Sequence, residues 1–157
     1  MTKLHTLLDE NSVLPRLEAR DRAGVLREMA AALAARHAGR LDADLLDKLL
    51  KREELGTTAI GKGVAVPHCR AAGLASPVLL LGLSKDGVPF EAVDGKPSQV
   101  FFLLVSPEDK PGDGLRLLAA IAALTRRSRA LASKLLKAPT PAEVLRTLRA
   151  EEEKPHG

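Results

Sequence analysis

Residues 100–105, Val100-Phe101-Phe102-Leu103-Leu104-Val105, form an unbroken apolar run, and residues 78–81, Val78-Leu79-Leu80-Leu81, form a second one. A strand with one face in water alternates apolar and polar residues, and neither run alternates. Both runs are therefore predicted to be strands that are covered on both faces. Helices must then lie on each side of the sheet, which predicts a three-layer α/β domain with a small central sheet.

Amphipathic helices are predicted before and after these strands. Residues 21–37 carry one apolar stripe at helical spacing, with Asp21 as a plausible N-cap. The residues of that stripe are Leu26, Met29, Ala30, Leu33 and Ala34. A second helix ends near Leu55-Gly56, and the last third of the chain is helical. Its final helix opens on Thr140-Pro141-Ala142-Glu143, a capping box with proline at the first helical position.

Shorter segments complete the predicted sheet. Val64-Ala65-Val66 is a strand that Pro67 ends. Residues 88–92 are expected to form another strand, which the turn at Asp94-Gly95 joins to the run at 100–105. A few strands separated by long helical stretches leave little room for a second core. We therefore expect one domain over residues 1–150, followed by a frayed tail over residues 151–157.

Composition excludes several classes of function. The chain has 157 residues, and its aromatic fraction of 2%, with no Trp and no Tyr, argues against recognition of nucleic acid by base stacking. Its one cysteine, Cys69, cannot form an internal disulfide, and its 4 histidines are too scattered for an obvious metal site. We therefore expect no metal and no cofactor.

Charge and hydropathy point to a cytoplasmic protein without nucleic-acid partners. The net charge is +4, and the basic excess gathers in a run without intervening acids. That run consists of Arg126, Arg127, Arg129, Lys134 and Lys137. It is typical of a solvated helix face, and as a nucleic-acid signal it is weak. No run of eighteen apolar residues occurs and the start lacks an apolar signal segment, so we expect no membrane span and a cytoplasmic location.

His68 is the strongest candidate for chemistry. A lone histidine is more often structural than functional, but His68 directly follows Pro67, which cannot continue an internal strand ladder. The ring therefore lies at a strand end, where α/β folds bind ligands. Neutral imidazole has one ring nitrogen with a free lone pair, so His68 is a candidate nucleophile.

Groups suited to a phosphate precede this histidine along the chain. Arg52 offers a planar guanidinium with five donors, and Thr57 and Thr58 offer hydroxyl donors. Gly61 and Gly63 permit close backbone passage and leave amides free to point at an anion. Phosphoryl transfer asks a protein mainly for positioning and charge stabilisation, which these groups supply. No metal is needed when the donor is an activated phosphohistidine.

Two other interpretations of the same residues are weaker. Gly56 and Gly61-Lys62 have the spacing of a nucleotide-binding P-loop, but Gly63 stands where the Ser or Thr hydroxyl for magnesium is required, and the loop leads into a strand. A Cys69–His68 dyad is disfavoured, because adjacent residues of an extended chain point to opposite faces. The simplest interpretation of Cys69 is a small, buried, inert side chain.

Four short segments lie within residues 52–68, namely Arg52-Glu53, Gly56-Thr57-Thr58, Ile60-Gly61 and Pro67-His68. Together these segments resemble the signature around the phosphorylated histidine of the fructose/mannitol-type enzyme IIA domains. These domains belong to the phosphoenolpyruvate-dependent phosphotransferase system. The resemblance extends over about residues 4–150. Within the family, the length and the Gly-Thr-Thr-x-Ile-Gly pattern are most similar to the nitrogen-regulatory enzyme IIA.

The resemblance implies a fold, a site and partners. The fold is a mixed, about five-stranded sheet between helices. His68 matches the phosphoryl acceptor, Arg52 the arginine near the active site, and Thr58 the hydroxyl residue of the loop that supports the histidine. The implied function is a regulatory phosphorelay in which an HPr-type phosphocarrier protein phosphorylates His68. The phosphorylation state then controls binding to regulatory protein targets.

One departure from the family keeps two alternatives open. Family members usually carry a second histidine just before a Leu-x-x-Leu run, and here that position is Gly114. The chain could accordingly be a binding regulator that is not phosphorylated. It could also be a sugar-specific enzyme IIA that passes phosphate to a permease complex.

Overall fold

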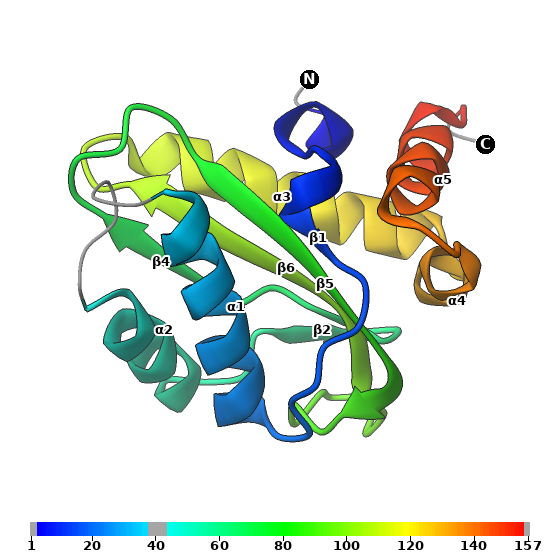
Figure 1. Ribbon diagram of the computed structural model, residues 1–157, viewed down its shortest axis with the longest axis horizontal. Helices are drawn as coiled ribbons and strands as arrows, with labels where there is room; N and C mark the ends of the chain where they lie inside the picture. Colours follow the sequence, from blue (N-terminus) through cyan, green and yellow to red (C-terminus); the bar gives the residue numbers. More distant parts are fainter. Residues whose placement is uncertain (1–2, 38–43, 156–157) are drawn as a thin grey trace.

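The computed structural model describes residues 3–37 and 44–155. Within them the chain forms two short 3-10 helices, six strands and five α-helices (Figure 1). In chain order the elements are η1 (Leu4–Leu7), η2 (Glu10–Ser12), β1 (Val13–Leu14), α1 (Arg22–Arg36), α2 (Leu45–Glu54), β2 (Ala59–Gly61), β3 (Val64–Ala65), β4 (His68–Ala71), β5 (Val78–Val88), β6 (Ser98–Pro107), α3 (Pro111–Arg127), α4 (Leu131–Lys137) and α5 (Pro141–Glu153).

The six strands form one mixed sheet around β6. The strand order is β1-β5-β6-β3-β2, and β4 also pairs with β6. β5 is antiparallel to β6, whereas β3 and β4 are both parallel to β6. Val64 of β3 lies opposite Val100, and His68 of β4 lies opposite Leu104. β4 therefore resumes, after Pro67, the pairing with β6 that β3 begins, and His68 is the residue at which it resumes.

Side chains of β6 alternate between two apolar cores, one on each face of the sheet. Val100, Phe102 and Leu104 pack with residues of α3, α4 and α5. Phe101, Leu103 and Val105 pack with residues of α1 and α2. All six are at most 1% exposed, and full burial of such a side chain contributes roughly 1.5–3 kcal/mol. The prediction of a three-layer α/β fold with strands covered on both faces is confirmed, and Figure 1 shows α1 and α2 in front of the sheet with α3 behind it.

Helix starts follow the predicted capping chemistry. The Asp21 carboxylate accepts a hydrogen bond from the Gly24 amide at 2.7 Å, which caps α1. The Thr140 hydroxyl accepts from the Glu143 amide at 3.2 Å, and Pro141 occupies the first position of α5. These side chains satisfy amides that have no partner inside their own helix.

The expected strand at residues 88–92 is wrong. Val88 is instead the last residue of β5, where it pairs with Ser98 of β6. Glu91 then adopts a positive φ of 56°, a left-handed conformation that cannot continue a strand. The connection between β5 and β6 is therefore a loop, and β5 runs 11 residues from Val78.

The expected fraying from residue 151 is also wrong, because α5 continues through Glu153 and docks on the start of the chain. The Glu152 carboxylate accepts from the backbone amides of Leu4 and His5 at 2.6 and 2.9 Å, and His5 Nδ1 lies 2.8 Å from it. Glu151 is buried and bonded to Ser128 and to Lys134. A buried carboxylate needs such partners, so both ends of the described chain are held in place.

No helix in the described residues is both apolar enough and long enough to cross a membrane.

Candidate functional site

His68 lies at the exposed edge of the sheet, on the face that α3 covers. Paired residues of parallel strands project to the same face, and the partner of His68, Leu104, belongs to the core under α3. The ring is only half-buried. β3 ends at Ala65 and β4 begins at His68, so His68 is the first strand residue after the interruption at Val66-Pro67.

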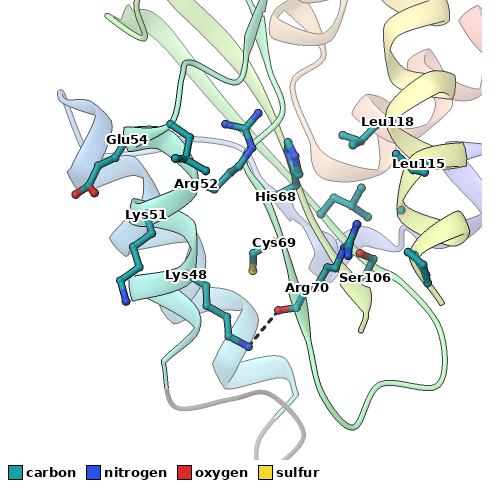
Figure 2. A pocket seen from close by; sticks show the side chains of 14 residues that line it. Lys48, Lys51, Arg52, Glu54, His68, Cys69, Arg70, Ser106, Leu115 and Leu118 are labelled. Atoms are coloured by element: carbon teal, nitrogen blue, oxygen red, sulfur yellow. Dashed lines mark hydrogen bonds between the residues drawn. The ribbon is translucent and has the colours of Figure 1, made fainter. Parts of the chain in front are cut away.

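A pocket of about 790 Å³ opens beside this ring. It is bounded by the C-terminal half of α2, by β4 and β6, and by the first two turns of α3 (Figure 2). Its charged lining consists of Lys48, Lys51, Arg52, Arg70 and Glu54, and its main apolar lining consists of Leu55, Leu104, Leu115 and Leu118. Four cations against one carboxylate make the pocket attractive to an anion.

A backbone contact sets the tautomer of His68. Its Nδ1 atom lies 2.8 Å from the carbonyl oxygen of Val66. A carbonyl oxygen only accepts hydrogen bonds, so Nδ1 carries the hydrogen and donates it. The lone pair of the neutral ring is therefore on Nε2.

The surroundings of His68 favour its neutral form. Burial lowers the pKa of His68 below its ordinary value of 6.5. The hydrogen bond to Val66 opposes this shift, the positive charge of Arg52 lowers the pKa further, and the negative charge of Glu53 raises it. Burial prevails, because a half-enclosed imidazolium loses part of its hydration. A nucleophilic lone pair is thus present at neutral pH.

Arg52 is positioned by the end of α2. Its Nη1 atom donates a hydrogen bond to the Gly56 carbonyl oxygen at 2.8 Å. This bond uses one of the five N–H donors of the guanidinium. Figure 2 shows the side chain extending from α2 to the vicinity of the His68 ring. The predicted proximity of Arg52 and His68 is therefore present in the structure.

Thr57 and Thr58 lie outside the pocket lining, which corrects their prediction as phosphate ligands. The Thr57 hydroxyl donates to the Phe90 carbonyl oxygen and accepts from the Ala59 amide at 3.0 Å. The Thr58 hydroxyl donates to the buried Glu53 carboxylate, which also accepts from the Thr58 amide at 3.2 Å. Both hydroxyls therefore tie the loop after α2 to its surroundings, and they support Arg52 indirectly.

Gly61 is the last residue of β2 and Gly63 lies in the turn before β3, and both are away from His68. The partners of Val64 and His68 on β6 are Val100 and Leu104. Four residues of extended strand span about 13 Å, and Gly63 is one residue further away. Neither glycine lines the pocket. The structure thus does not bring these two amides to the histidine, contrary to the prediction.

The pocket contains functional candidates that the sequence analysis missed. Arg70 is on the same strand face as His68, two residues along β4, and its paired residue on β6 is Ser106. Lys48 and Lys51 enter from α2, and the Lys48 ammonium donates to the Arg70 carbonyl oxygen at 3.2 Å (Figure 2). Alternate residues of a strand share one face, so Arg70 could have been predicted to lie beside His68. No comparable pattern in the sequence places Lys48 and Lys51 near His68.

Gly114 lies in the first turn of α3 and lines the same pocket.

Among residues 3–37 and 44–155 there is no group of three or more His, Cys, Asp or Glu side chains that could hold a metal ion.

Comparison with known proteins gives a consistent family. Residues 6–151 match the family model described as phosphoenolpyruvate-dependent sugar phosphotransferase system, EIIA 2. A nitrogen regulatory protein of Bradyrhizobium diazoefficiens is 38% identical over 120 residues, which cover 76% of this chain and 78% of that protein. A nitrogen regulatory protein of Pseudomonas aeruginosa is 36% identical over 141 residues, which cover 89% of this chain and 90% of that protein.

Solved structures agree with the fold. The crystal structure of the nitrogen regulatory protein IIA-Ntr from Neisseria meningitidis superposes with a TM-score of 0.82 at 28% identity. The superposition covers 92% of this chain and 98% of that one.

Proposed function

Because the chain belongs to the EIIA 2 family of the phosphoenolpyruvate-dependent sugar phosphotransferase system, we propose that His68 accepts a phosphoryl group from an HPr-type phosphocarrier protein. The single observation that carries this proposal is the contact between His68 Nδ1 and the Val66 carbonyl oxygen at 2.8 Å. It leaves the lone pair on Nε2, in a ring that lines a pocket with four cationic side chains.

The proposed step moves one phosphoryl group between two imidazoles. The Nε2 lone pair of His68 attacks the phosphorus atom, and a new N–P bond forms while the N–P bond of the donor phosphohistidine breaks. The donor imidazole leaves with the bonding electron pair. The hydrogen on Nδ1 of His68 stays in place and continues to donate to Val66, so no external base is required.

Cationic side chains supply the charge stabilisation. The phosphoryl oxygens are negative throughout the transfer, and the guanidinium of Arg52 reaches the ring from α2. Arg70 approaches along β4 on the same face as His68. Positively charged donors arranged before the reaction starts lower the barrier, because they need not reorganise during it.

The rim of the pocket suits a docking protein. Leu55 at the end of α2 is 85% exposed, and Leu115 in the first turn of α3 is 62% exposed. Both leucines line the pocket beside His68, Leu55 from the end of α2 and Leu115 from the start of α3. Exposed apolar side chains around a polar centre are typical of a protein interface. A phosphocarrier that covers them would bring its own phosphohistidine to Nε2.

The role of this transfer is regulatory in our proposal. Two relatives that are 38% and 36% identical, and that align over most of this chain and most of their own length, are nitrogen regulatory proteins. A phosphoryl group on His68 adds negative charge in the middle of the docking surface and partly neutralises its cations. Regulatory target proteins would therefore distinguish the phosphorylated from the unphosphorylated form. Such a relay operates in the cytoplasm, where phosphoenolpyruvate is available.

The test is reconstitution of the relay. The purified chain is incubated with phosphoenolpyruvate, enzyme I and the HPr-type carrier, and intact-protein mass spectrometry follows the uptake of phosphoryl groups. We expect one acid-labile phosphoryl group on the wild type and none on His68→Ala. His37→Ala is the matched control, because His37 is a histidine outside the pocket. Lack of uptake by the wild type, or uptake by His68→Ala, would refute the proposal.

A further inference from the structure

Gly114 packs closely against the side chain of Ser106. A Cβ atom built on Gly114 would lie 2.7 Å from Ser106 Oγ and 3.0 Å from Ser106 Cβ. Non-bonded carbon atoms pack at about 3.5–4.0 Å, so any side chain here would displace Ser106. Glycine inside a helix costs about 0.5–1 kcal/mol relative to alanine. In the first turn of α3 the absence of a side chain at Gly114 allows Ser106 to keep its position.

The Ser106 hydroxyl has no hydrogen-bond partner within the described part of the chain. The residue retains only 5% of its accessible surface, yet it lines the pocket beside His68. Its hydroxyl is also absent from the buried atoms that lack a partner, so the oxygen reaches the open space of the pocket. The hydroxyl is therefore free to donate a hydrogen bond to a group that enters the pocket from outside the chain.

The register of the sheet places Ser106 on the phosphoryl side of His68. His68 lies opposite Leu104, and Arg70 lies opposite Ser106, so all four side chains project to one face. Ser106 is diagonal to His68, one strand away and two residues along. With strands about 4.8 Å apart and a rise of about 3.3 Å per residue, the two Cα atoms are about 8 Å apart. An imidazole with a phosphoryl group on its outer nitrogen can span this separation.

We propose that Ser106 is a phosphoryl-binding residue whose hydroxyl donates a hydrogen bond to the group carried on His68, in space that Gly114 leaves open. This inference rests on the proposed function. Arg70 is the paired residue of Ser106 on the neighbouring strand and also lines the pocket, so a neutral and a charged donor are available to the phosphoryl oxygens from the sheet. Arg52 faces them from α2. The phosphoryl group is thereby held from both sides while it is transferred.

The test compares Ser106→Ala with Ser106→Thr in single-turnover phosphorylation by the HPr-type carrier. Ser106→Ala is expected to slow uptake at least tenfold, toward the roughly hundredfold loss that removal of one preorganised donor can cause. Its melting temperature is expected to stay at the wild-type value, because the hydroxyl has no partner among residues 3–37 and 44–155. Ser106→Thr keeps a hydroxyl and is expected to restore most of the rate. Ser133→Ala, which removes an exposed hydroxyl on α4, is the control.

A second pair of variants separates the hydroxyl from the packing. Gly114→Ala forces Ser106 aside and is expected to slow uptake as much as Ser106→Ala does. Adding Ser106→Gly to Gly114→Ala relieves the clash and restores stability, and the rate is expected to remain low because no hydroxyl is present. If the double variant or Ser106→Ala is phosphorylated within about twofold of the wild-type rate, the role of Ser106 is overturned while the proposed function stands. If the wild type itself takes up no phosphoryl group, both are overturned.

Discussion

The Nδ1 atom of His68 donates a hydrogen bond to the backbone carbonyl oxygen of Val66, at 2.8 Å. This contact spans only two residues, and Pro67 between them restricts the backbone that makes it. The acceptor is a backbone atom, so no side-chain substitution at position 66 removes it. The orientation of the imidazole is therefore built into the Val66-Pro67-His68 segment.

The first prediction is that the phosphoryl group is attached to Nε2 and not to Nδ1. The Nδ1 atom is occupied by its hydrogen, which Val66 holds, whereas Nε2 has the lone pair. Long-range proton–nitrogen NMR spectra of the phosphorylated protein distinguish the two isomers. A phosphoryl group on Nδ1 would contradict the tautomer derived from the structure.

The second prediction concerns the pH dependence of phosphoryl uptake. Burial holds the pKa of His68 below 6.5, and the ring must be neutral to attack. Uptake should therefore exceed half of its maximal rate at pH 6.5 and fall as the pH drops through the lowered pKa. The rate is measured from pH 8 to pH 5 with the carrier phosphorylated beforehand, so that the earlier steps of the relay do not limit it. A midpoint at or above 6.5 would be inconsistent with this environment.

The same shift predicts a change in stability. Between the lowered pKa and 6.5 the unfolded chain binds a proton at His68 while the folded chain does not, so stability decreases as the pH falls through this window. Urea unfolding of the wild type and of His68→Gln at several pH values tests this. We expect the difference in unfolding free energy between the two to change only within the window.

The third prediction is that Arg52→Gln slows phosphoryl uptake and raises the pKa of His68. Loss of one charge-assisted donor is worth about 1.5–3 kcal/mol, which corresponds to a rate decrease of roughly ten- to a hundredfold. The pKa rises because the positive charge of Arg52 no longer opposes protonation of the ring. NMR titration of the His68 ring follows the second effect.

Arg146→Gln provides the control for this change. Arg146 is exposed on α5, is paired with Glu143 at 3.5 Å, and lies outside the pocket. Removing its charge should alter neither the uptake rate nor the titration of His68. An unchanged rate in Arg52→Gln would remove Arg52 from the proposed mechanism.

The fourth prediction concerns acid stability at the end of α5. Burial alone would raise the pKa of Glu151, but hydrogen bonds from Lys154, Ser128 and Lys134 lower it to about 2. The unfolded value is 4.5, so the stabilisation by Glu151 is complete above pH 4.5 and is lost as the pH falls toward 2. Glu151→Gln should destabilise the protein by about 1–3 kcal/mol at pH 7, and the two unfolding free energies should converge near pH 2.

Glu153→Gln is the matched control for Glu151→Gln. Glu153 is exposed and pairs with Arg149 alone at 3.0 Å, an arrangement worth at most about 1 kcal/mol. Denaturant unfolding at pH 7 should therefore show a clearly smaller effect than Glu151→Gln. Equal effects would mean that the buried network around Glu151 does not stabilise the end of the chain.

Local patterns were sufficient to predict the layers of the fold. The unbroken apolar runs at 78–81 and 100–105 require cover on both faces, and both lie in strands with a core on each side. The capping residues Asp21 and Thr140 act as predicted, because a cap involves only neighbours along the chain. His68 and Arg52 also lie together as predicted.

These local patterns could not predict contacts between residues that are distant along the chain. The Thr57 hydroxyl has Phe90 as its acceptor, 33 residues away, and the Thr58 hydroxyl has the buried Glu53 carboxylate. The sequence does not show whether a threonine hydroxyl near a candidate nucleophile donates to a ligand or to another group of the protein. The prediction for Gly61 and Gly63 failed because closeness along an extended chain is not closeness in space.

The amino-acid sequence was sufficient to identify His68 as the candidate nucleophile and to predict the two-sided burial of the sheet, since each depends on residues within a few positions of one another. The contact between His68 and the Val66 carbonyl oxygen, and the groups around the ring, became apparent only from the folded chain. Pairing of β4 with β6 brings Ser106 beside Arg70, and docking of α3 brings Gly114 against Ser106. Such neighbours arise from strand register and helix packing. The register links Arg70 to Ser106, which is 36 positions away, and neither kind of contact leaves a periodic trace in the chain.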